Sequence, residues 1–424
     1  MRKYLRNTPI TILAILAVLG VLVGGGRGDG PSELQRATGP YQQDIVRWEI
    51  SHFMDKWVHL ALRPIQGTPT EEEERQAIAE FFSLGEEERL LLAEMEQLLA
   101  SSPDAAGTAR DIGGALETVQ DQRKDLHPVV QEAMESAITQ ALEEMDVIDR
   151  IGPIRWPPVN FTFAPNGLVL VRSPRDEILR LEDMLLRSDV PLLEQIALEE
   201  QLEEDGDTSA LVIRVGGIAT YPAQVMPHAS LHHTLFLAAH EWLHHWMFFR
   251  PLGKQWWAGG EMTSINETVA DILGEEVGDR AYELLTGRTV QREPWQPPSA
   301  RPPYEPEPGV FDFTYEMRQT RMHLEALLEA DRVEKAEEYL EERRRVFVAH
   351  GWNLRKLNTA WFAFYGTYAI GPGSISPIED QLRTLRAESG SLATFLDHIS
   401  SINGPGQLES IARSAGWAPL DADA

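Results

Sequence analysis

The sequence contains no cysteine among its 424 residues. This absence excludes a disulfide framework, a thiolate metal site and a cysteine nucleophile together. Any metal ion that the protein binds must therefore be held by histidine, aspartate and glutamate side chains. The chain has 12 histidines and 66 acidic residues, so ligands of this kind are present.

Basic residues are also scarce. The chain has 38 lysines and arginines against 66 acidic residues, which gives a formal net charge of −28. A surface this acidic repels nucleic acid, so we predict no nucleic-acid partner. The hydrophobic fraction of 43% and the charged fraction of 25% are those of an ordinary globular protein. The length allows two or three domains and a large core, whereas the oligomeric state is left open.

Only one hydrophobic run approaches the length of a membrane span. Residues 9–26 would extend about 27 Å as a helix, barely the thickness of a bilayer core. Three basic residues precede this run: Arg2, Lys3 and Arg6. The basic flank predicts that residues 1–30 anchor a single-pass membrane protein whose catalytic region is extracytoplasmic. The alternative is a cleaved signal peptide and a secreted protein, because the run is short and small residues follow it.

The remaining sequence predicts a predominantly helical α+β fold with a small mixed β-sheet. Apolar residues at three- and four-residue spacings predict helices in the N-terminal and C-terminal regions and a further helix at 176–204. Alternating residues around Asn166-Gly167 predict a hairpin, and a strand follows at 208–225. We divide the chain into a helical region at 31–150, a core at 151–290, a loop with seven prolines at 291–310, and a helical region at 311–424.

A pair of glycines interrupts the predicted strand at 208–225. Gly216 and Gly217 are adjacent in it. Glycine inside a strand marks a bulge or a place where another group approaches the backbone closely. The strand immediately precedes the segment that carries the chemistry described next.

The segment His240-Glu241-Trp242-Leu243-His244 has the spacing of a metal-binding helix. Residues four apart project from one helix face, so both imidazoles can reach one Zn²⁺ at about 2.0–2.1 Å. Glu241 lies about 100° round the helix, where it can accept a proton from water without ligating the metal.

A second helical segment supplies two carboxylates. Glu267 follows His244 after 22 intervening residues, and Asp271 lies four residues further on. A catalytic zinc takes three protein ligands and keeps one position open, so Glu267 can be the third ligand. Asp271 can accept a hydrogen bond from a zinc-binding histidine and fix its ring. We therefore predict one Zn²⁺ per chain.

This combination of motifs resembles the gluzincin metallopeptidases, the superfamily of thermolysin and the membrane-alanyl-type aminopeptidases. The matching residues are His240-Glu241-x-x-His244 and Asn266-Glu267-x-x-Ala270-Asp271, within about 211–275. The resemblance implies a zincin-like catalytic core at 151–290, zinc bound by the two histidines and the later glutamate, and Glu241 as general base. The exopeptidase signature of the aminopeptidases is missing, so internal and terminal cleavage both remain open.

Oxyanion stabilisation needs a donor from outside the zinc motif. The candidates are Tyr365, Tyr368, His323 and Arg318. The function that we predict is zinc-dependent hydrolysis of peptide or protein substrates. The alternative is a catalytically inactive zincin fold that serves as a binding or scaffold module at the cell surface.

Overall fold

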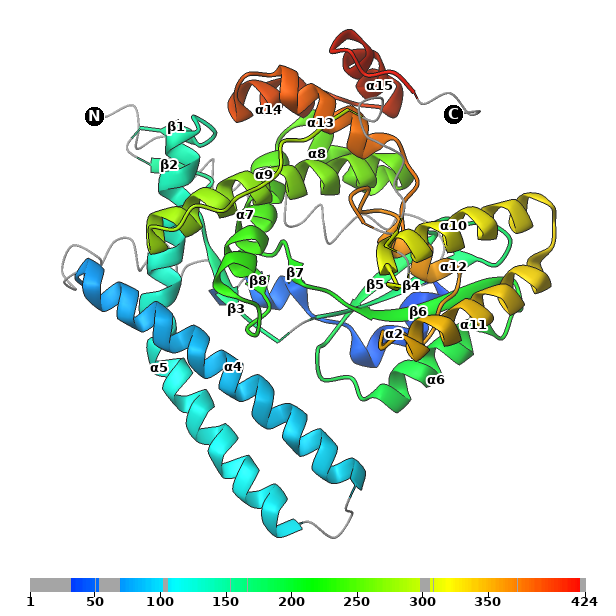
Figure 1. Cartoon of the computed structure of the whole chain (residues 1–424), viewed down its shortest axis with the longest axis horizontal. Helices are drawn as coiled ribbons and strands as arrows, with labels where there is room; N and C mark the ends of the chain where they lie inside the picture. The colour runs from blue at the N-terminus through cyan, green and yellow to red at the C-terminus, as the bar shows by residue number, and fades with distance from the viewer. Residues whose placement is uncertain are drawn as a thin grey trace.

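The computed structural model describes residues 32–419, except 50, 53–68, 102–105, 153, 166, 298–305, 308 and 372. The protein is α+β and mostly helical, with 61% helix, 10% strand and small sheets, which confirms the predicted fold class at this level. Figure 1 shows most of the short strands across the middle of the molecule, with helices around them.

A long helical hairpin projects from the body of the molecule (Figure 1). It consists of α4 (Glu71–Ser101) and α5 (Ala106–Glu144), and it is preceded by the short helix α2 (Glu33–Thr38). Thr70 and Glu73 bond reciprocally at the start of α4, as in a capping box. A buried ion pair of 2.5 Å between Arg123 and Glu88 joins the two helices, and Arg123 also donates to the carbonyl of Pro227. The hydrogen bond to Pro227 therefore attaches the hairpin to the loop at residues 226–230.

Three small sheets follow the hairpin in the described part of the chain. Strands β1 (Asp149–Ile151) and β2 (Ile154–Trp156) form the first. The second has the order β3-β8-β7, from β3 (Phe161–Phe163), β8 (Ala223–Val225) and β7 (Gly217–Ile218). The third has the order β5-β4-β6, from β5 (Glu182–Leu186), β4 (Leu168–Pro174) and β6 (Thr208–Arg214), and α6 (Leu192–Glu203) packs on it.

The hairpin predicted at Asn166-Gly167 is wrong. Strand β3 pairs in parallel with β8, whereas β4 pairs antiparallel with β5 and β6. The two strands that flank these residues therefore belong to different sheets. Asn166 itself lies outside the described residues.

Two helices form the centre of the larger core. Helix α7 (Leu231–Met247) is capped by Ser230, whose hydroxyl accepts a hydrogen bond from the backbone N–H of His233. It packs on α9 (Gly260–Thr286). A β-carbon at Gly278 would lie only 2.9 Å from backbone atoms of Phe236. Glycine at this position therefore lets the two helices cross at close range. Helix α8 (Pro251–Lys254) and the 3₁₀ helix η2 (Trp256–Ala258) connect them.

The C-terminal helices cover two different surfaces (Figure 1). Helices α10 (Phe313–Glu329), α11 (Val333–Ala349) and α12 (Thr359–Tyr365) share a core with the sheet β5-β4-β6. Helices α13 (Ile378–Glu388), α14 (Leu392–Ser400) and α15 (Pro405–Ser414) join the core of α9. The described part of 291–310 contains neither helix nor strand.

The membrane assignment made from the sequence is corrected. No helix in the described part of the chain is both long and apolar enough to cross a bilayer. Helices α4 and α5 have the length, but many of their residues are charged. Residues 1–30, on which the assignment depended, lie outside the described residues. The structure thus does not support a single-pass membrane protein, or a membrane contact through the N-terminal segment.

Candidate metal centre

Helices α7 and α9 bring three metal-binding side chains together where they cross. The Nε2 atoms of His240 and His244 are 3.2 Å apart. Oε2 of Glu267 lies 3.3 Å from Nε2 of His240 and 3.7 Å from Nε2 of His244. His240 and Glu267 are each only 6% exposed. The three predicted ligands therefore form a buried group that could hold a metal ion.

The spacing of these donor atoms fits a small tetrahedral ion. Ligand atoms at 2.0–2.1 Å from a tetrahedral Zn²⁺ are separated by about 3.3 Å. The observed separations lie between 3.2 and 3.7 Å. A charge-assisted hydrogen bond between an imidazole and a carboxylate would be shorter, at about 2.7–2.9 Å. Two imidazole nitrogens and one carboxylate oxygen are also a donor set that zinc accepts.

Asp271 lies behind the first histidine. Its Oδ1 is 2.9 Å from Nδ1 of His240, on the opposite side of the ring from the donor group. This ion-pair contact holds the ring with Nε2 facing the other two donors. Burial lowers the pKa of His240, but its contacts with Asp271 and Glu267 outweigh burial and raise that pKa well above the usual value.

Glu241 lies beside the donor group without being part of it. It is 7% exposed, and burial raises its pKa, an effect that the charges of His240 and His244 oppose. A β-carbon built on Gly217 of strand β7 would overlap the Glu241 carboxylate. The close approach that the glycine pair predicted is therefore the contact between the edge of the β3-β8-β7 sheet and this carboxylate.

Trp256 was not found by the sequence analysis. Its indole N–H donates to Oε1 of Glu267 at 2.9 Å, so it occupies the oxygen that does not face the histidines. The hydroxyl of Thr263 on α9 donates a hydrogen bond of 2.9 Å to the Trp256 carbonyl. The only sequence signal was a tryptophan in the short connection between two motif-bearing helices.

The other predicted site residues lie in different places. Tyr368 follows Thr367, whose carbonyl accepts a hydrogen bond of 2.6 Å from Ser264 of α9. Burial and the charges of Glu267 and Glu241 raise the pKa of the Tyr368 phenol. Tyr365 packs on Trp361, with ring centroids 4.4 Å apart. The remaining two candidates lie on α10, where His323 packs on Tyr339 of α11 and Arg318 is exposed.

His245 contacts the connection between β7 and β8. Its Nε2 lies 2.8 Å from the carbonyl of Thr220, and its ring contacts that of Tyr221. Burial lowers the pKa of His245 to about 4, so the ring is neutral at pH 7 and donates to that carbonyl. This contact joins α7 to the connection between β7 and β8.

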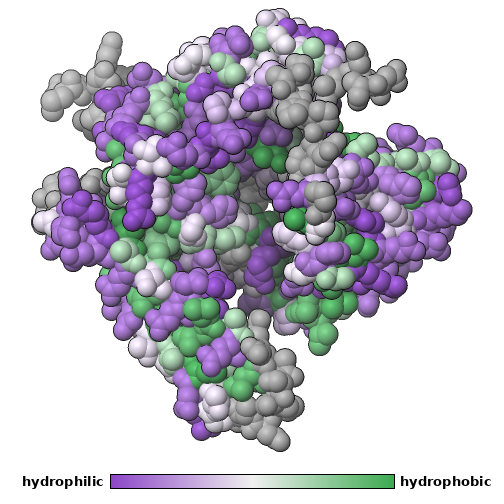
Figure 2. Space-filling model, in the orientation of Figure 1, coloured by the Kyte–Doolittle hydropathy of each residue, from purple (hydrophilic) through white to green (hydrophobic). Residues whose placement is uncertain are grey.

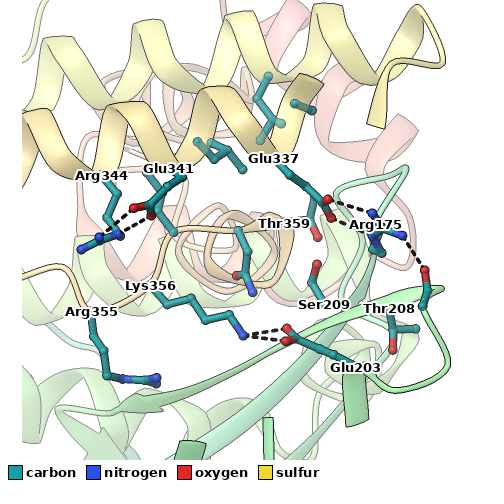
Figure 3. Close-up of a pocket in the computed structure, with 16 residues that line it drawn as sticks. Arg175, Glu203, Thr208, Ser209, Glu337, Glu341, Arg344, Arg355, Lys356 and Thr359 are labelled. Atoms are coloured by element: carbon teal, nitrogen blue, oxygen red, sulfur yellow. Dashed lines mark hydrogen bonds and ion pairs between the residues drawn. The ribbon is translucent and has the colours of Figure 1, made fainter. Parts of the chain in front are cut away.

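A cavity of about 530 Å³ lies elsewhere, between the sheet β5-β4-β6 and helices α10 to α12 (Figure 3). Its charged side chains all have ion-pair partners: Arg175 with Glu337, Arg344 with Glu341, Lys356 with Glu203, and Arg355 with Glu199, which lies outside the cavity lining. None of the donor-group residues lines it. We place the candidate chemistry at the donor group, because three ligands converge there, whereas the cavity's charges all have partners.

Comparisons of the chain with protein-family models, with curated proteins and with solved structures found no match. The functional argument therefore depends on the geometry of the donor group.

Proposed function

We propose that this protein is a zinc-dependent peptidase of the gluzincin type with a zincin-like catalytic core. The observation that carries the proposal is the mutual spacing of the donor atoms of His240, His244 and Glu267, at 3.2–3.7 Å. These three residues would hold the ion, and three protein ligands leave one coordination position open, as in catalytic zinc sites. Zinc held there would supply Lewis acidity, which polarises a carbonyl and lowers the pKa of water towards 7.

Glu241 has the position of a general base. Its carboxylate is buried beside the donor group and, in the described part of the chain, forms no ion pair with lysine or arginine. A buried carboxylate with a raised pKa can take a proton from the attacking water and return it to the leaving amine. Gly217 leaves the space that this carboxylate occupies.

Tyr368 is the residue that we assign to the oxyanion. Its pKa is raised by burial and then by the negative charges of Glu267 and Glu241, so the phenol stays protonated at neutral pH. A protonated phenol can donate a hydrogen bond to the charge that develops on a substrate carbonyl oxygen. Of the four candidates that the sequence offered, Tyr368 is the one whose pKa reflects the charges of this group.

The proposal is tested by digesting a broad peptide library with the full-length protein and with Glu241→Gln. The glutamine keeps the volume of the side chain but cannot act as a base. We expect the wild type to cleave peptides and the variant to be slower by about 10²–10⁴-fold with its zinc retained. Cleavage by the variant at the wild-type rate would remove Glu241 from the mechanism. If the wild type cleaves nothing while binding peptides, the scaffold alternative is correct.

A further inference from the structure

An arginine lies close to the candidate metal centre. Arg180 follows β4 in the connection to β5, and its guanidinium carbon is 5.9 Å from the ring centre of Trp256 and 5.5 Å from that of Phe364. These separations are within the range of cation–π attraction. Trp256 bonds to Glu267 with its indole N–H. One aromatic side chain therefore separates the guanidinium from a proposed zinc ligand.

The guanidinium of Arg180 is only partly satisfied. The side chain is 16% exposed, and Nη2 donates to Asp183 at 2.8 Å. Its Nε is buried and has no hydrogen-bond partner among the residues that the structure describes. A buried N–H of a charged group without a partner costs more than a neutral one, so such a group is expected to gain a partner when a ligand or water binds.

The surroundings of Arg180 favour an anionic partner. Its positive charge lowers the pKa of the Tyr368 phenol, whereas the negative charges of Glu267 and Glu241 raise it. The protein as a whole is strongly acidic, with a net charge of −28, so this local positive charge contrasts with the rest of the molecule. A guanidinium presents a planar fork of N–H groups that matches a carboxylate in two parallel hydrogen bonds.

We propose that Arg180 binds a carboxylate of the peptide substrate and thereby determines which peptides are cleaved. This inference rests on the proposed peptidase function. The carboxylate comes either from the C-terminus of the substrate or from an aspartate or glutamate side chain. Since Trp256 contacts both Arg180 and Glu267, we place this carboxylate close to the cleaved bond.

The first test needs no change at Arg180. Full-length Glu241→Gln protein with one equivalent of Zn²⁺ is titrated with N-acetylated random hexapeptides that end in a free acid, and with the same peptides as amides. A second pair of libraries carries glutamate or glutamine at internal positions. We expect the carboxylate form of at least one pair to bind about 10- to 100-fold more tightly. A preference in the first pair identifies the C-terminus, and one in the second identifies a side chain.

The second test removes the guanidinium. In the same background, Arg180→Gln should abolish the preference for the carboxylate form, whereas Arg180→Lys should keep part of it, because it retains the charge but not the planar fork. Arg89→Gln is the control: it removes one positive charge from an exposed ion pair with Glu86 on α4. A thermal melt of each variant, compared with the parent, shows whether the fold is intact.

The outcomes separate this inference from the peptidase proposal. Equal binding of the carboxylate and neutral peptides, or a preference that survives in Arg180→Gln, overturns the role of Arg180. Absence of binding by all four libraries overturns it as well. Library cleavage by the wild type is a separate measurement, so the peptidase proposal can stand when Arg180 fails, and the carboxylate preference can be found in a protein that cleaves nothing.

Discussion

The crossing of α7 and α9 and the cavity beside α11 both gather many charged groups, but they differ in how those charges are compensated. In the cavity, Glu337 and Glu341 are 43% and 44% exposed, and each bonds to an arginine. At the crossing, Glu241 and Glu267 are 7% and 6% exposed, and no lysine or arginine of the described residues forms an ion pair with either. Exposed pairs are complete without a ligand, whereas buried carboxylates that converge with two imidazoles must be compensated by a proton on an imidazole or by a metal cation.

Among the substitutions that test this comparison, we expect the largest effect from one at Gly217. In Gly217→Ala the new methyl group would overlap the Glu241 carboxylate and displace it. A displacement of about 1 Å can lower a reaction rate about 10²-fold. We expect peptide hydrolysis to fall by about that factor, with zinc content unchanged, as measured by library digestion and metal analysis. The control is Gly206→Ala. Gly206 has open space around it but a positive φ of 75°, so alanine strains the backbone there. This variant should be less stable but should hydrolyse peptides at the wild-type rate.

The next effect concerns the residue behind His240. Asp271→Asn removes the charge that lies 2.9 Å from Nδ1 of His240. We expect zinc affinity to fall about 10- to 100-fold without loss of the fold. Competition with a chelator of known affinity measures this change, and circular dichroism monitors the fold. Unchanged affinity would mean that Asp271 has no part in the centre.

A comparable effect is expected at Trp256. Trp256→Phe keeps the aromatic ring but removes the N–H that donates to Glu267. One lost hydrogen bond to a charged group is worth about 1.5–3 kcal/mol, which is close to the 10- to 100-fold change in zinc affinity expected for Asp271. The same chelator competition measures it. An affinity equal to that of the wild type would show that the indole does not orient the ligand.

The smallest effect is expected in the cavity. Glu337→Gln removes the negative charge and one of the two oxygens that accept 2.7 Å hydrogen bonds from Arg175, but both side chains are partly exposed. Exposed ion pairs contribute about 0–1 kcal/mol to stability, so urea unfolding should show a change within that range. Turnover and zinc content should not change. A loss of either would connect the cavity to the chemistry and break the comparison.

The sequence was most informative where one helix carries the whole pattern. His240 and His244 are four residues apart on α7, so their common face followed from helix geometry alone. Glu267 and Asp271 could be assigned because α9 carries them with the same periodicity. Trp256 and Arg180 could not be assigned, because their positions depend on how η2 and the β4–β5 connection fold against those helices.

Strands that depend on distant partners were predicted less well. Residues 182–186 were included in a helix at 176–204, since Glu, Met and Leu are good helix formers. In the structure they pair with β4 as strand β5, and the helix begins only at Leu192. The single strand predicted at 208–225 is three strands in the structure, β6 in one sheet and β7 and β8 in another. Only β6 has the continuous run rich in β-branched residues on which the prediction rested. Pairing with β4 determined the structure of residues 182–186, whereas local composition was enough to predict β6.

Metal content tests the central claim most directly. Full-length wild type, His244→Ala and the cavity variant Glu337→Gln are purified with Zn²⁺ in the medium, and their metals are measured by mass spectrometry. The account predicts one zinc per chain in the wild type and in Glu337→Gln, and well below one in His244→Ala. A wild type without zinc, or a His244→Ala protein that keeps a full equivalent, would contradict it.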